Sequence, residues 1–216
     1  MNNFSFDYSV KNPQTSKKDN KVIIMFHGYG SNKDDLFSFA KFMNPDFLII
    51  SIQAPIKLDN HSHCWWPLHY NDNMQLKMDT KLAKQSVKEL NKFICEDLAK
   101  KYNFSLNQVY LLGFSQGCMI SYALSINYPE NFKKAVGLSG KIPYEIIEFD
   151  VEFDYSNHNF FCSHGINDHV IPIEIGRESN EWFNEKKIKH EYHEFESAHG
   201  INSDNFTKMN LWLSKN

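Results

Sequence analysis

The residues with the clearest chemical potential lie in the stretch LLGFSQGCMI, where a serine stands between two glycines. GFSQG (113–117) has the form G-x-S-x-G, and an apolar, strand-like run precedes it while a helical pattern follows it. In such a turn the serine takes a strained backbone conformation that exposes its hydroxyl, and the amides of the helix N-terminus point at the site. A Gly/Ser-rich turn without chemistry is the alternative. In this context we interpret Ser115 as a nucleophile.

A serine hydroxyl needs a base that removes its proton and a third group that orients the base. In folds with this turn, the acid and the histidine follow the serine along the chain, at the ends of later strands. Asp168 lies in HGINDHVIP after the strand-like NFFCS, and His199 lies in ESAHGINS after the strand-like EYHEF. We therefore predict that Ser115, Asp168 and His199 form a catalytic triad.

Other acids and histidines fit these roles less well. Asp150 and Asp154 belong to EFDVEFD, an acidic stretch typical of a solvated surface. His190 and His193 lie within or beside a predicted strand. His164 begins the loop that holds the predicted acid, and we interpret it as a hydrogen-bonding residue of that loop.

Acyl transfer also requires N–H donors for the oxyanion of the tetrahedral intermediate, and losing one raises the barrier by roughly 2.7–4 kcal/mol. Gln116, the residue after the nucleophile, offers its backbone amide. The glycines of HGYG (27–30) allow the chain to present the amide of Tyr29, and we interpret His27 as a structural residue of this loop. A turn of no chemical role and a phosphate-binding loop are the alternatives, although neither a Walker A nor a GxGxxG pattern is present.

Short apolar runs and helical patterns alternate along the chain, and they must position these residues. Apolar runs in which polar residues do not alternate favour strands buried on both faces, as in a parallel sheet covered by helices. The sequence therefore predicts an α/β fold with a mostly parallel, doubly wound sheet and helices on both faces. The predicted strands are FSFDYSV (4–10), VIIMF (22–26), FLIISI (47–52), VYLL (109–112), AVGL (135–138) and FFC (160–162); the helical patterns cover residues 83–98, 119–127, 174–184 and 206–213. The segment 54–79 shows neither the alternation of a half-exposed strand nor the periodicity of an amphipathic helix.

Composition limits the classes of function. A length of 216 residues fits a single domain, residues 1–216, and a net charge of −3 gives no basis for nucleic-acid binding. Arg177 is the only arginine, which disfavours mechanisms with several guanidinium clamps. Four scattered cysteines are typical of reduced thiols, and the sequence shows no signal peptide and no transmembrane segment. We expect a cytoplasmic protein.

With these motifs the chain resembles the α/β-hydrolases, specifically the phospholipase/carboxylesterase family of cap-less enzymes that includes acyl-protein thioesterases. The motifs are FHGYGSN (26–32), GFSQG (113–117), GLSGKIP (137–143), HGINDHVIP (164–172) and AHGI (198–201). The resemblance implies an α/β-hydrolase fold without a cap domain. It also implies that Ser115, Asp168 and His199 are nucleophile, acid and base, with oxyanion donors from Tyr29 and Gln116.

Two features differ from the eukaryotic thioesterases of this family. Cys118 follows the serine turn where those enzymes usually have another glycine, and the first loop reads HGYG rather than HGLGD. The sequence is therefore more similar to a bacterial esterase. We interpret Cys118 as a small buried thiol rather than a second nucleophile.

The aromatic segment HSHCWWPLHY (61–70) allows two interpretations. In the family this region carries an aromatic residue near the serine, so Trp65 and Trp66 are candidate substrate-binding residues; the alternative is that both indoles pack the loop onto the body of the protein. His61, His63, Cys64 and His69 suggest zinc, but H-x-H-C is not a recurring ligand spacing and we predict no metal.

The resulting hypothesis is a serine hydrolase that cleaves carboxylic esters through an acyl-enzyme, without a cofactor. Thioesters are an alternative substrate, which would make the chain an acyl-protein thioesterase; a lysophospholipase is another alternative. The expected partners are a small-molecule or lipid acyl ester, or an acylated protein, and the resemblance allows a homodimer. A non-catalytic binding module and an acyltransferase are further alternatives, of which the complete triad disfavours the binding module.

Overall fold

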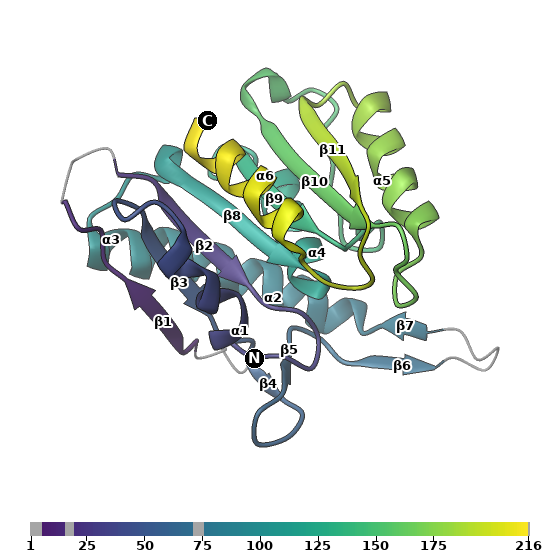
Figure 1. Cartoon of the computed structure of the whole chain (residues 1–216), viewed down its shortest axis with the longest axis horizontal. Helices are drawn as coiled ribbons and strands as arrows, with labels where there is room; N and C mark the ends of the chain where they lie inside the picture. Colours follow the sequence, from purple (N-terminus) through teal and green to yellow (C-terminus); the bar gives the residue numbers. More distant parts are fainter. Residues whose placement is uncertain (1–5, 16–19, 71–75, 216) are drawn as a thin grey trace.

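A seven-stranded sheet forms the centre of the protein in its computed structural model, which describes residues 6–15, 20–70 and 76–215 (Figure 1). The strand order is β1-β3-β2-β8-β9-β10-β11. β1 pairs antiparallel with β3, and the other neighbouring pairs are parallel. The strands are β1 (Tyr8–Lys11), β2 (Val22–Phe26), β3 (Leu48–Ile52), β8 (Val109–Phe114), β9 (Lys134–Leu138), β10 (Asn159–Gly165) and β11 (His190–Phe195).

The apolar runs became strands because both of their faces are covered. Every residue of β2, β3 and β10 is buried, which explains why these runs show no alternation. β11 lies at the edge of the sheet and is only partly buried, which explains why its sequence HEYHEF is largely polar. Each predicted strand is confirmed to within a few residues, although Phe4 and Ser5 of the first predicted run lie outside the described residues.

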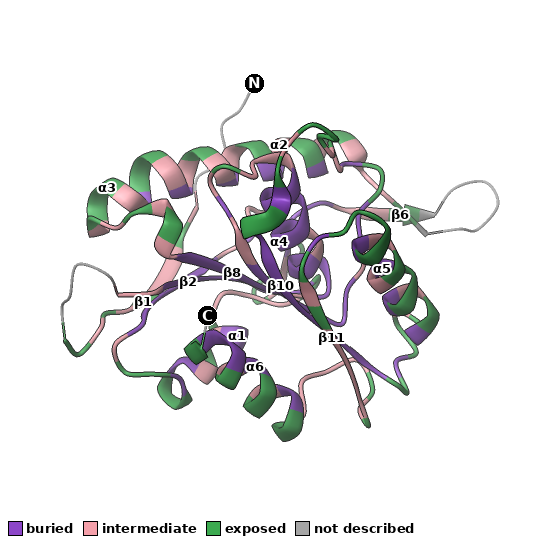
Figure 2. Cartoon of the chain, turned by 90° about the horizontal axis from the view of Figure 1, so that it is seen from above, coloured by how far each residue is buried: buried purple, intermediate pink, exposed green. Residues whose placement is uncertain are grey.

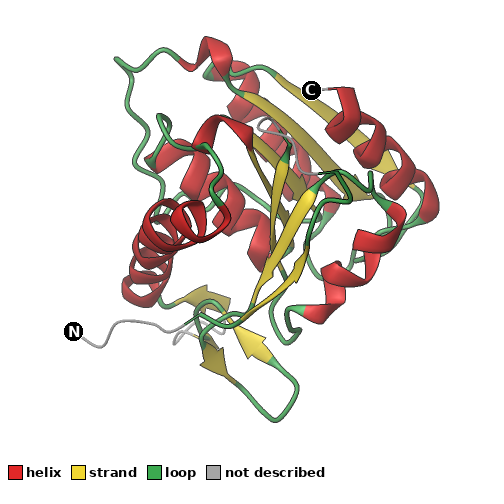
Figure 3. Ribbon diagram, turned by 90° about the vertical axis from the view of Figure 1, so that its left-hand side faces the viewer, coloured by secondary structure: helices red, strands yellow, loops and turns green. Residues whose placement is uncertain are grey.

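Helices cover both faces of the sheet, as predicted, and Figures 2 and 3 show the two layers. One face carries α2 (Thr80–Lys92), a π-helical turn (Phe93–Leu98), α3 (Ala99–Tyr102), α4 (Gln116–Asn127) and α5 (Ile173–Glu185). The other face carries α1 (Asp34–Phe37), the 3₁₀ helix at Ser38–Phe42 and α6 (Ser203–Lys215). Two further 3₁₀ turns lie at Leu106–Gln108 and Tyr155–Asn157. Among the described residues, no helix combines the length and the apolar character that crossing a bilayer requires.

Helix α2 shows how the sequence pattern sets the packing. The Asp79 carboxylate caps the helix by accepting a hydrogen bond from the Leu82 amide at 3.0 Å. Ala83, Val87 and Leu90 then recur on one face and are buried against the sheet. The predicted periodicity over residues 83–98 is confirmed, and it continues through the π-helical turn.

The segment 54–79 differs from the expectation that it has no regular structure. It contains two small antiparallel ladders, which pair β4 (Ile56–Lys57) with β5 (His63–Cys64) and β6 (Leu68–Tyr70) with β7 (Leu76–Met78). Runs of two or three residues are too short to show a period, so the sequence could not indicate them. Asp59 supports the first ladder because its carboxylate accepts hydrogen bonds from the amides of His61 and Ser62.

Two glycines let helix α4 approach the strands below it. A Cβ atom on Gly117 would overlap the carbonyl oxygen of Phe26 at the end of β2. A Cβ atom on Gly113 would overlap the carbonyl oxygen of Gly117 itself. The turn between β8 and α4 is therefore tight because its flanking residues have no side chains.

This contact predicts that a glycine-to-alanine substitution in this helix lowers the free energy of unfolding, although alanine is usually the more stabilising residue in a helix. Gly117→Ala improves helix propensity by about 1 kcal/mol, but the overlap with Phe26 is expected to lower the free energy of unfolding by about 3 kcal/mol. Urea unfolding followed by circular dichroism measures the change. Gly200→Ala is the control, because a Cβ atom there meets no atom within 4 Å. Equal stabilities of the two variants would show that the contact is not restrictive.

Candidate active site

The predicted site residues meet at one edge of the sheet. Tyr29 follows β2, Ser115 follows β8, Asp168 follows β10 and His199 follows β11. Because these strands are parallel, their carboxyl ends lie along the same edge, where ligand sites of open α/β sheets are found. The fold therefore gathers side chains that are up to 170 positions apart, from Tyr29 to His199.

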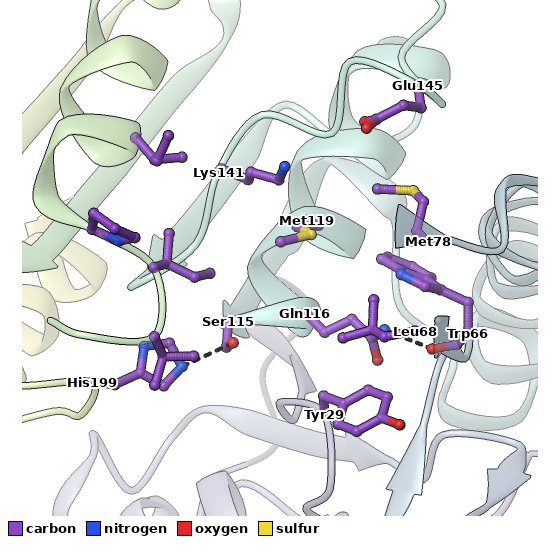
Figure 4. Close-up of a pocket in the computed structure, with 14 residues that line it drawn as sticks. Tyr29, Trp66, Leu68, Met78, Ser115, Gln116, Met119, Lys141, Glu145 and His199 are labelled. Atoms are coloured by element: carbon purple, nitrogen blue, oxygen red, sulfur yellow. Dashed lines mark hydrogen bonds between the residues drawn. The ribbon is translucent and has the colours of Figure 1, made fainter. Parts of the chain in front are cut away.

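The structure joins the three predicted triad residues in one chain of hydrogen bonds. The Ser115 hydroxyl donates to His199 Nε2 at 3.0 Å (Figure 4), and His199 Nδ1–H donates to Asp168 Oδ2 at 2.7 Å. This order requires a neutral histidine that carries its proton on Nδ1. The arrangement can remove the serine proton and hold the histidine during the transfer. The catalytic role of the three residues remains a prediction.

Ser115 has a strained backbone. Its φ of 54° and ψ of −113° lie outside the regions that ordinary L-residues prefer. Its amide donates to the Leu138 carbonyl at 2.9 Å, and its carbonyl accepts from the amides of Cys118 and Met119 in the first turn of α4. Such strain costs about 1–3 kcal/mol and persists only where the surroundings impose it. Here the bond to β9 and the first turn of α4 impose it.

The Asp168 side chain is fully buried and hydrogen-bonded on both oxygens. Oδ1 accepts from the amides of Val170 and Ile171 at 2.8 and 2.9 Å, and Oδ2 accepts from His199. Burial alone would raise the pKa of this carboxyl, but the hydrogen bonds from His199, Ile171 and Val170 outweigh burial and lower the pKa below its usual value. Asp168 is therefore a carboxylate at neutral pH.

Neighbouring contacts hold the His199 ring and the loop around Asp168 in place. The Phe114 ring packs against the His199 ring, with centroids 4.9 Å apart. His164 Nε2–H donates to the Ile171 carbonyl at 2.8 Å, which fastens the loop around Asp168, as the sequence suggested. Gly165 at the end of β10 lies so close to the backbone of Ser197 and Ala198 that a Cβ atom would overlap them. The loops of the acid and the histidine are thus held together.

His27 fixes the loop that carries Tyr29. Its Nδ1–H donates to the Gly28 carbonyl at 2.8 Å, and its Nε2 accepts from the Ala54 amide at 3.1 Å. Burial lowers the pKa of His27 to about 4, so the ring is neutral. The backbone of His63 also holds this loop, because it accepts from the Gly30 amide at 2.9 Å and donates to the Ser31 carbonyl at 2.8 Å.

The two predicted oxyanion donors are available for a ligand. The backbone amides of Tyr29 and Gln116 donate to no acceptor within the described part of the chain. Gln116 is the first residue of α4, where amides have no partner inside the helix. Gly28 lies beside the nucleophile, since a Cβ atom on it would be 3.4 Å from Ser115 Cβ. The Tyr29 loop therefore borders the serine.

The Gln116 side chain has a role that the sequence reasoning missed. Its Oε1 accepts from the Trp65 amide at 2.9 Å. Its Nε2 donates to the Trp66 carbonyl, also at 2.9 Å (Figure 4). Trp66 lines the cavity beside Ser115, whereas Trp65 is buried behind it, donating its indole N–H to the His27 carbonyl at 2.9 Å. The two candidate substrate-binding residues are thus placed differently, and Trp65 is a packing residue.

A cavity of about 570 Å³ opens beside the triad (Figure 4). Its walls are largely apolar and come from loops, helices and short strands that are far apart in the sequence, so side-chain type alone could not reveal most of them. The lining residues are Tyr29, Trp66, Leu68, Met78, Ser115, Gln116, Met119, Lys141, Glu145, Val170, Ile171, Pro172, Ile175 and His199. A cavity of this size suits a ligand as large as a medium-chain ester.

Comparison with known proteins identifies the family. A model of the family described as Phospholipase/Carboxylesterase matches residues 9–216. The chain belongs to the phospholipase/carboxylesterase family. Acyl-protein thioesterase 1 of Yarrowia lipolytica is 26% identical over 219 residues, which cover 90% of this chain and 91% of that protein. The family and the fold predicted from the motifs are therefore confirmed, and with them the assignment to hydrolases of the carboxylesterase and thioesterase type.

Solved structures agree with this fold. The Bacillus cereus carboxylesterase superposes with a TM-score of 0.83 at 20% identity, covering 97% of this chain and 94% of that one. The Mesorhizobium loti carboxylesterase gives a TM-score of 0.82 at 15% identity, covering 100% and 98% of the two chains. At such identities the likeness concerns the fold alone.

Cys118 is a packed, buried residue in this phospholipase/carboxylesterase. Burial raises the pKa of the Cys118 thiol well above its usual value, and the residue packs behind the serine turn against Gly140. A thiol with a raised pKa is a poor nucleophile. In the described residues, no group of three or more His, Cys, Asp or Glu side chains is arranged to hold a metal.

The neutral, buried His27 predicts a pH-dependent stability. The pKa of about 4 in the folded chain lies below the ordinary 6.5, so the unfolded chain binds the extra proton first as pH falls. Stability is therefore complete above pH 6.5 and is expected to decrease by about 3 kcal/mol between pH 6.5 and pH 4 through this residue. Urea unfolding of the wild type and His27→Gln at several pH values measures this slope.

The Gln variant is expected to lose that part of the slope, while His61→Gln, at an exposed position, keeps it. Asp168 affects stability in a separate, lower pH range. Because its pKa is lowered in the folded chain, its contribution to stability is lost only as pH falls below about 4. Identical slopes for wild type and His27→Gln would contradict the assignment of a neutral His27.

Proposed function

We propose that this phospholipase/carboxylesterase hydrolyses carboxylic esters through an acyl-enzyme on Ser115. The hydrogen-bond chain from Asp168 through His199 to Ser115 supports this proposal most directly, because it combines a nucleophile, a base and a buried carboxylate in working order. The cavity begins at the same serine, so a bound ester would lie within reach of it.

In the first step Ser115 Oγ attacks the acyl carbonyl carbon while His199 Nε2 takes the hydroxyl proton. The carbonyl oxygen becomes an oxyanion that accepts hydrogen bonds from the amides of Tyr29 and Gln116. The Asp168 carboxylate stabilises the imidazolium through Nδ1–H. His199 then passes the proton to the leaving oxygen, the bond between the carbonyl carbon and the alcohol breaks, and an acyl-Ser115 ester remains.

In the second step water takes the place of the alcohol. His199 Nε2 removes a proton from that water, whose oxygen attacks the acyl-Ser115 carbonyl, and the same two amides hold the second oxyanion. The proton returns to Ser115 Oγ as the acyl bond breaks, which releases a carboxylic acid and restores the enzyme. The cycle consumes one water and needs no cofactor.

The cavity walls favour an apolar substrate group near the serine. Trp66, Leu68 and Met78 form one side, and Met119 lies between Ser115 and the far end in the view of Figure 4. Burying a methylene group against such walls contributes about 0.8 kcal/mol. We assign this surface, with Trp66 at its centre, to the acyl or alcohol chain.

Thioester hydrolysis is a second candidate, because the yeast relatives with this fold and family are named acyl-protein thioesterases. The same steps apply with a thiolate as the leaving group. Tyr29 and Val170 line the cavity and are 41% and 68% exposed, so its mouth is open to a bulky substrate such as an acylated protein or a lysophospholipid. Parallel assays of ethyl esters, S-ethyl thioesters and lysophosphatidylcholine separate these substrates.

Removal of the nucleophile tests the whole proposal. Ser115→Ala is expected to reduce hydrolysis of p-nitrophenyl esters, from acetate to palmitate, by at least about 10⁴-fold, because the acyl-enzyme can no longer form. Ser214→Ala, at an exposed serine near the end of α6, is the matched control and keeps wild-type turnover. A fluorophosphonate probe should label the wild type and the control but not Ser115→Ala. Absence of turnover and labelling in folded wild type would favour a binding module.

The acid can be tested with little change of shape. Asp168→Asn keeps an acceptor oxygen for the Val170 and Ile171 amides but loses the charge that holds His199. We expect kcat to fall by about 10³–10⁴-fold while KM changes little, since Asp168 does not line the cavity. Asp154→Asn, an exposed acid at a helix cap, is the control. A loss of less than about tenfold would contradict the role of Asp168.

A further inference from the structure

Lys141 is the only cation among the described residues that line the cavity. It belongs to GLSGKIP, the segment after β9, and its side chain is half-buried. Its ammonium group forms no hydrogen bond and no ion pair within the described residues. An amine that is partly removed from water without a partner loses solvation that a bound anion would restore. The position therefore favours contact with an anion.

The backbone around Lys141 is fixed on both sides. A Cβ atom on the preceding Gly140 would lie 2.6 Å from Cys118 Sγ and 2.9 Å from the Ser115 carbonyl, so the chain passes directly behind the nucleophile. The following Ile142 is buried and donates its amide to Ser179 Oγ at 3.0 Å. The Lys141 backbone is thus anchored to the same turn that holds Ser115, and its side chain lines the cavity.

Figure 4 shows where the charge lies relative to the reacting atoms. Ser115 and His199 lie at one end of the cavity, and the Lys141 side chain extends across the other end, beyond Met119. An ester whose carbonyl is at Ser115 would place its remote end near the ammonium group. The walls in between are apolar, which leaves Lys141 to recognise the remote end of the substrate.

Glu145 is the one carboxylate that shares this end of the cavity with Lys141 among the described lining residues. The two side chains form no ion pair, and Glu145 is exposed while Lys141 is half-buried. The Glu145 charge is therefore screened by solvent, and it reduces the positive potential at Lys141 without cancelling it.

We propose that Lys141 binds a carboxylate at the remote end of the ester substrate. This inference rests on the proposed esterase function and defines its substrate class as esters that carry a negative charge several bonds from the scissile carbonyl. Lysine suits this role as a point charge on a long stem that can follow an apolar wall. The carboxylate can belong to the acyl group or to the alcohol, and the two arms of the experiment distinguish these sources.

The experiment compares charged esters with neutral esters of the same length. Monoethyl glutarate against ethyl pentanoate places the charge on the acyl side, and 4-(butanoyloxy)butanoate against butyl butanoate places it on the alcohol side. The readout is the ratio of kcat/KM for the charged ester to that for its neutral partner. Lys141→Met is expected to lower this ratio by about tenfold in one arm, the effect of a partly exposed charge-assisted hydrogen bond.

Two further variants test the sign of the effect. Lys141→Arg is expected to keep the ratio near the wild-type value because it keeps the charge. Glu145→Gln is expected to raise the ratio by about twofold, since it removes a negative charge that repels the substrate carboxylate. The wild-type ratio should also fall toward that of Lys141→Met in 0.5 M NaCl. Lys100→Met, at an exposed lysine of α3 outside the cavity, is the matched control that keeps the ratio.

The outcomes separate this inference from the proposed function. If wild type and Lys141→Met hydrolyse the neutral esters and show equal ratios in both arms, the inference is wrong while the esterase function stands. An equal decrease in Lys100→Met would also overturn it, because the effect would then be that of overall charge. If no ester is hydrolysed and the fluorophosphonate probe labels nothing, both proposals fail.

Discussion

The contact between the backbone of α4 and the end of β2 determines where the groups of the site can lie. Gly117 touches the carbonyl of Phe26, so the first turn of α4 and the loop that begins at His27 are adjacent. Ser115 precedes this turn and Tyr29 lies in that loop, which places the serine beside one predicted oxyanion donor and directly before the other, Gln116. A larger residue at 117 would separate β2 from α4 and with it the nucleophile from the Tyr29 amide. The strain at Ser115 is stable because this packing leaves no relaxed alternative.

Two histidines at the same edge of the sheet differ because their partners differ. Burial lowers the pKa of His27 to about 4, so the ring is neutral and its Nε2 accepts from the Ala54 amide. His199 instead donates from Nδ1 to the Asp168 carboxylate, and its Nε2 faces the Ser115 hydroxyl. One histidine can therefore fasten a loop while the other can exchange protons. The hydrogen-bond partners assign these roles, and residue type does not.

Much of this arrangement was predictable because it depends on spacing. VIIMF became β2 with the predicted bounds, since a strand buried on both faces is apolar throughout. Asp168 and His199 were predictable because each follows a strand signal, and parallel strands end at one edge. The choice between Trp65 and Trp66 was not, because both are buried indoles in a bend between β5 and β6, and only the fold determines which of them lines the cavity. The clamp by the Gln116 side chain was also hidden, because its partners are backbone groups about fifty residues away.

The residues that were hardest to predict are the ones that shape the cavity, and there is a physical reason for this. Backbone amides, strand ends and buried hydrogen bonds hold the reacting groups, so these parts tolerate little change. The cavity walls come from side chains of several separate elements, including Leu68 on β6, Met78 on β7 and Met119 on α4, and only the fold brings them together. Such positions can change charge or size without disturbing the hydrogen bonds of Ser115, His199 and Asp168. Lys141 has a fixed backbone and an unconstrained side chain. Its backbone passes behind the nucleophile, while its ammonium group has no partner in the described structure. The proposed recognition of substrate charge at Lys141 is therefore separate from the hydrogen bonds that hold the reacting groups.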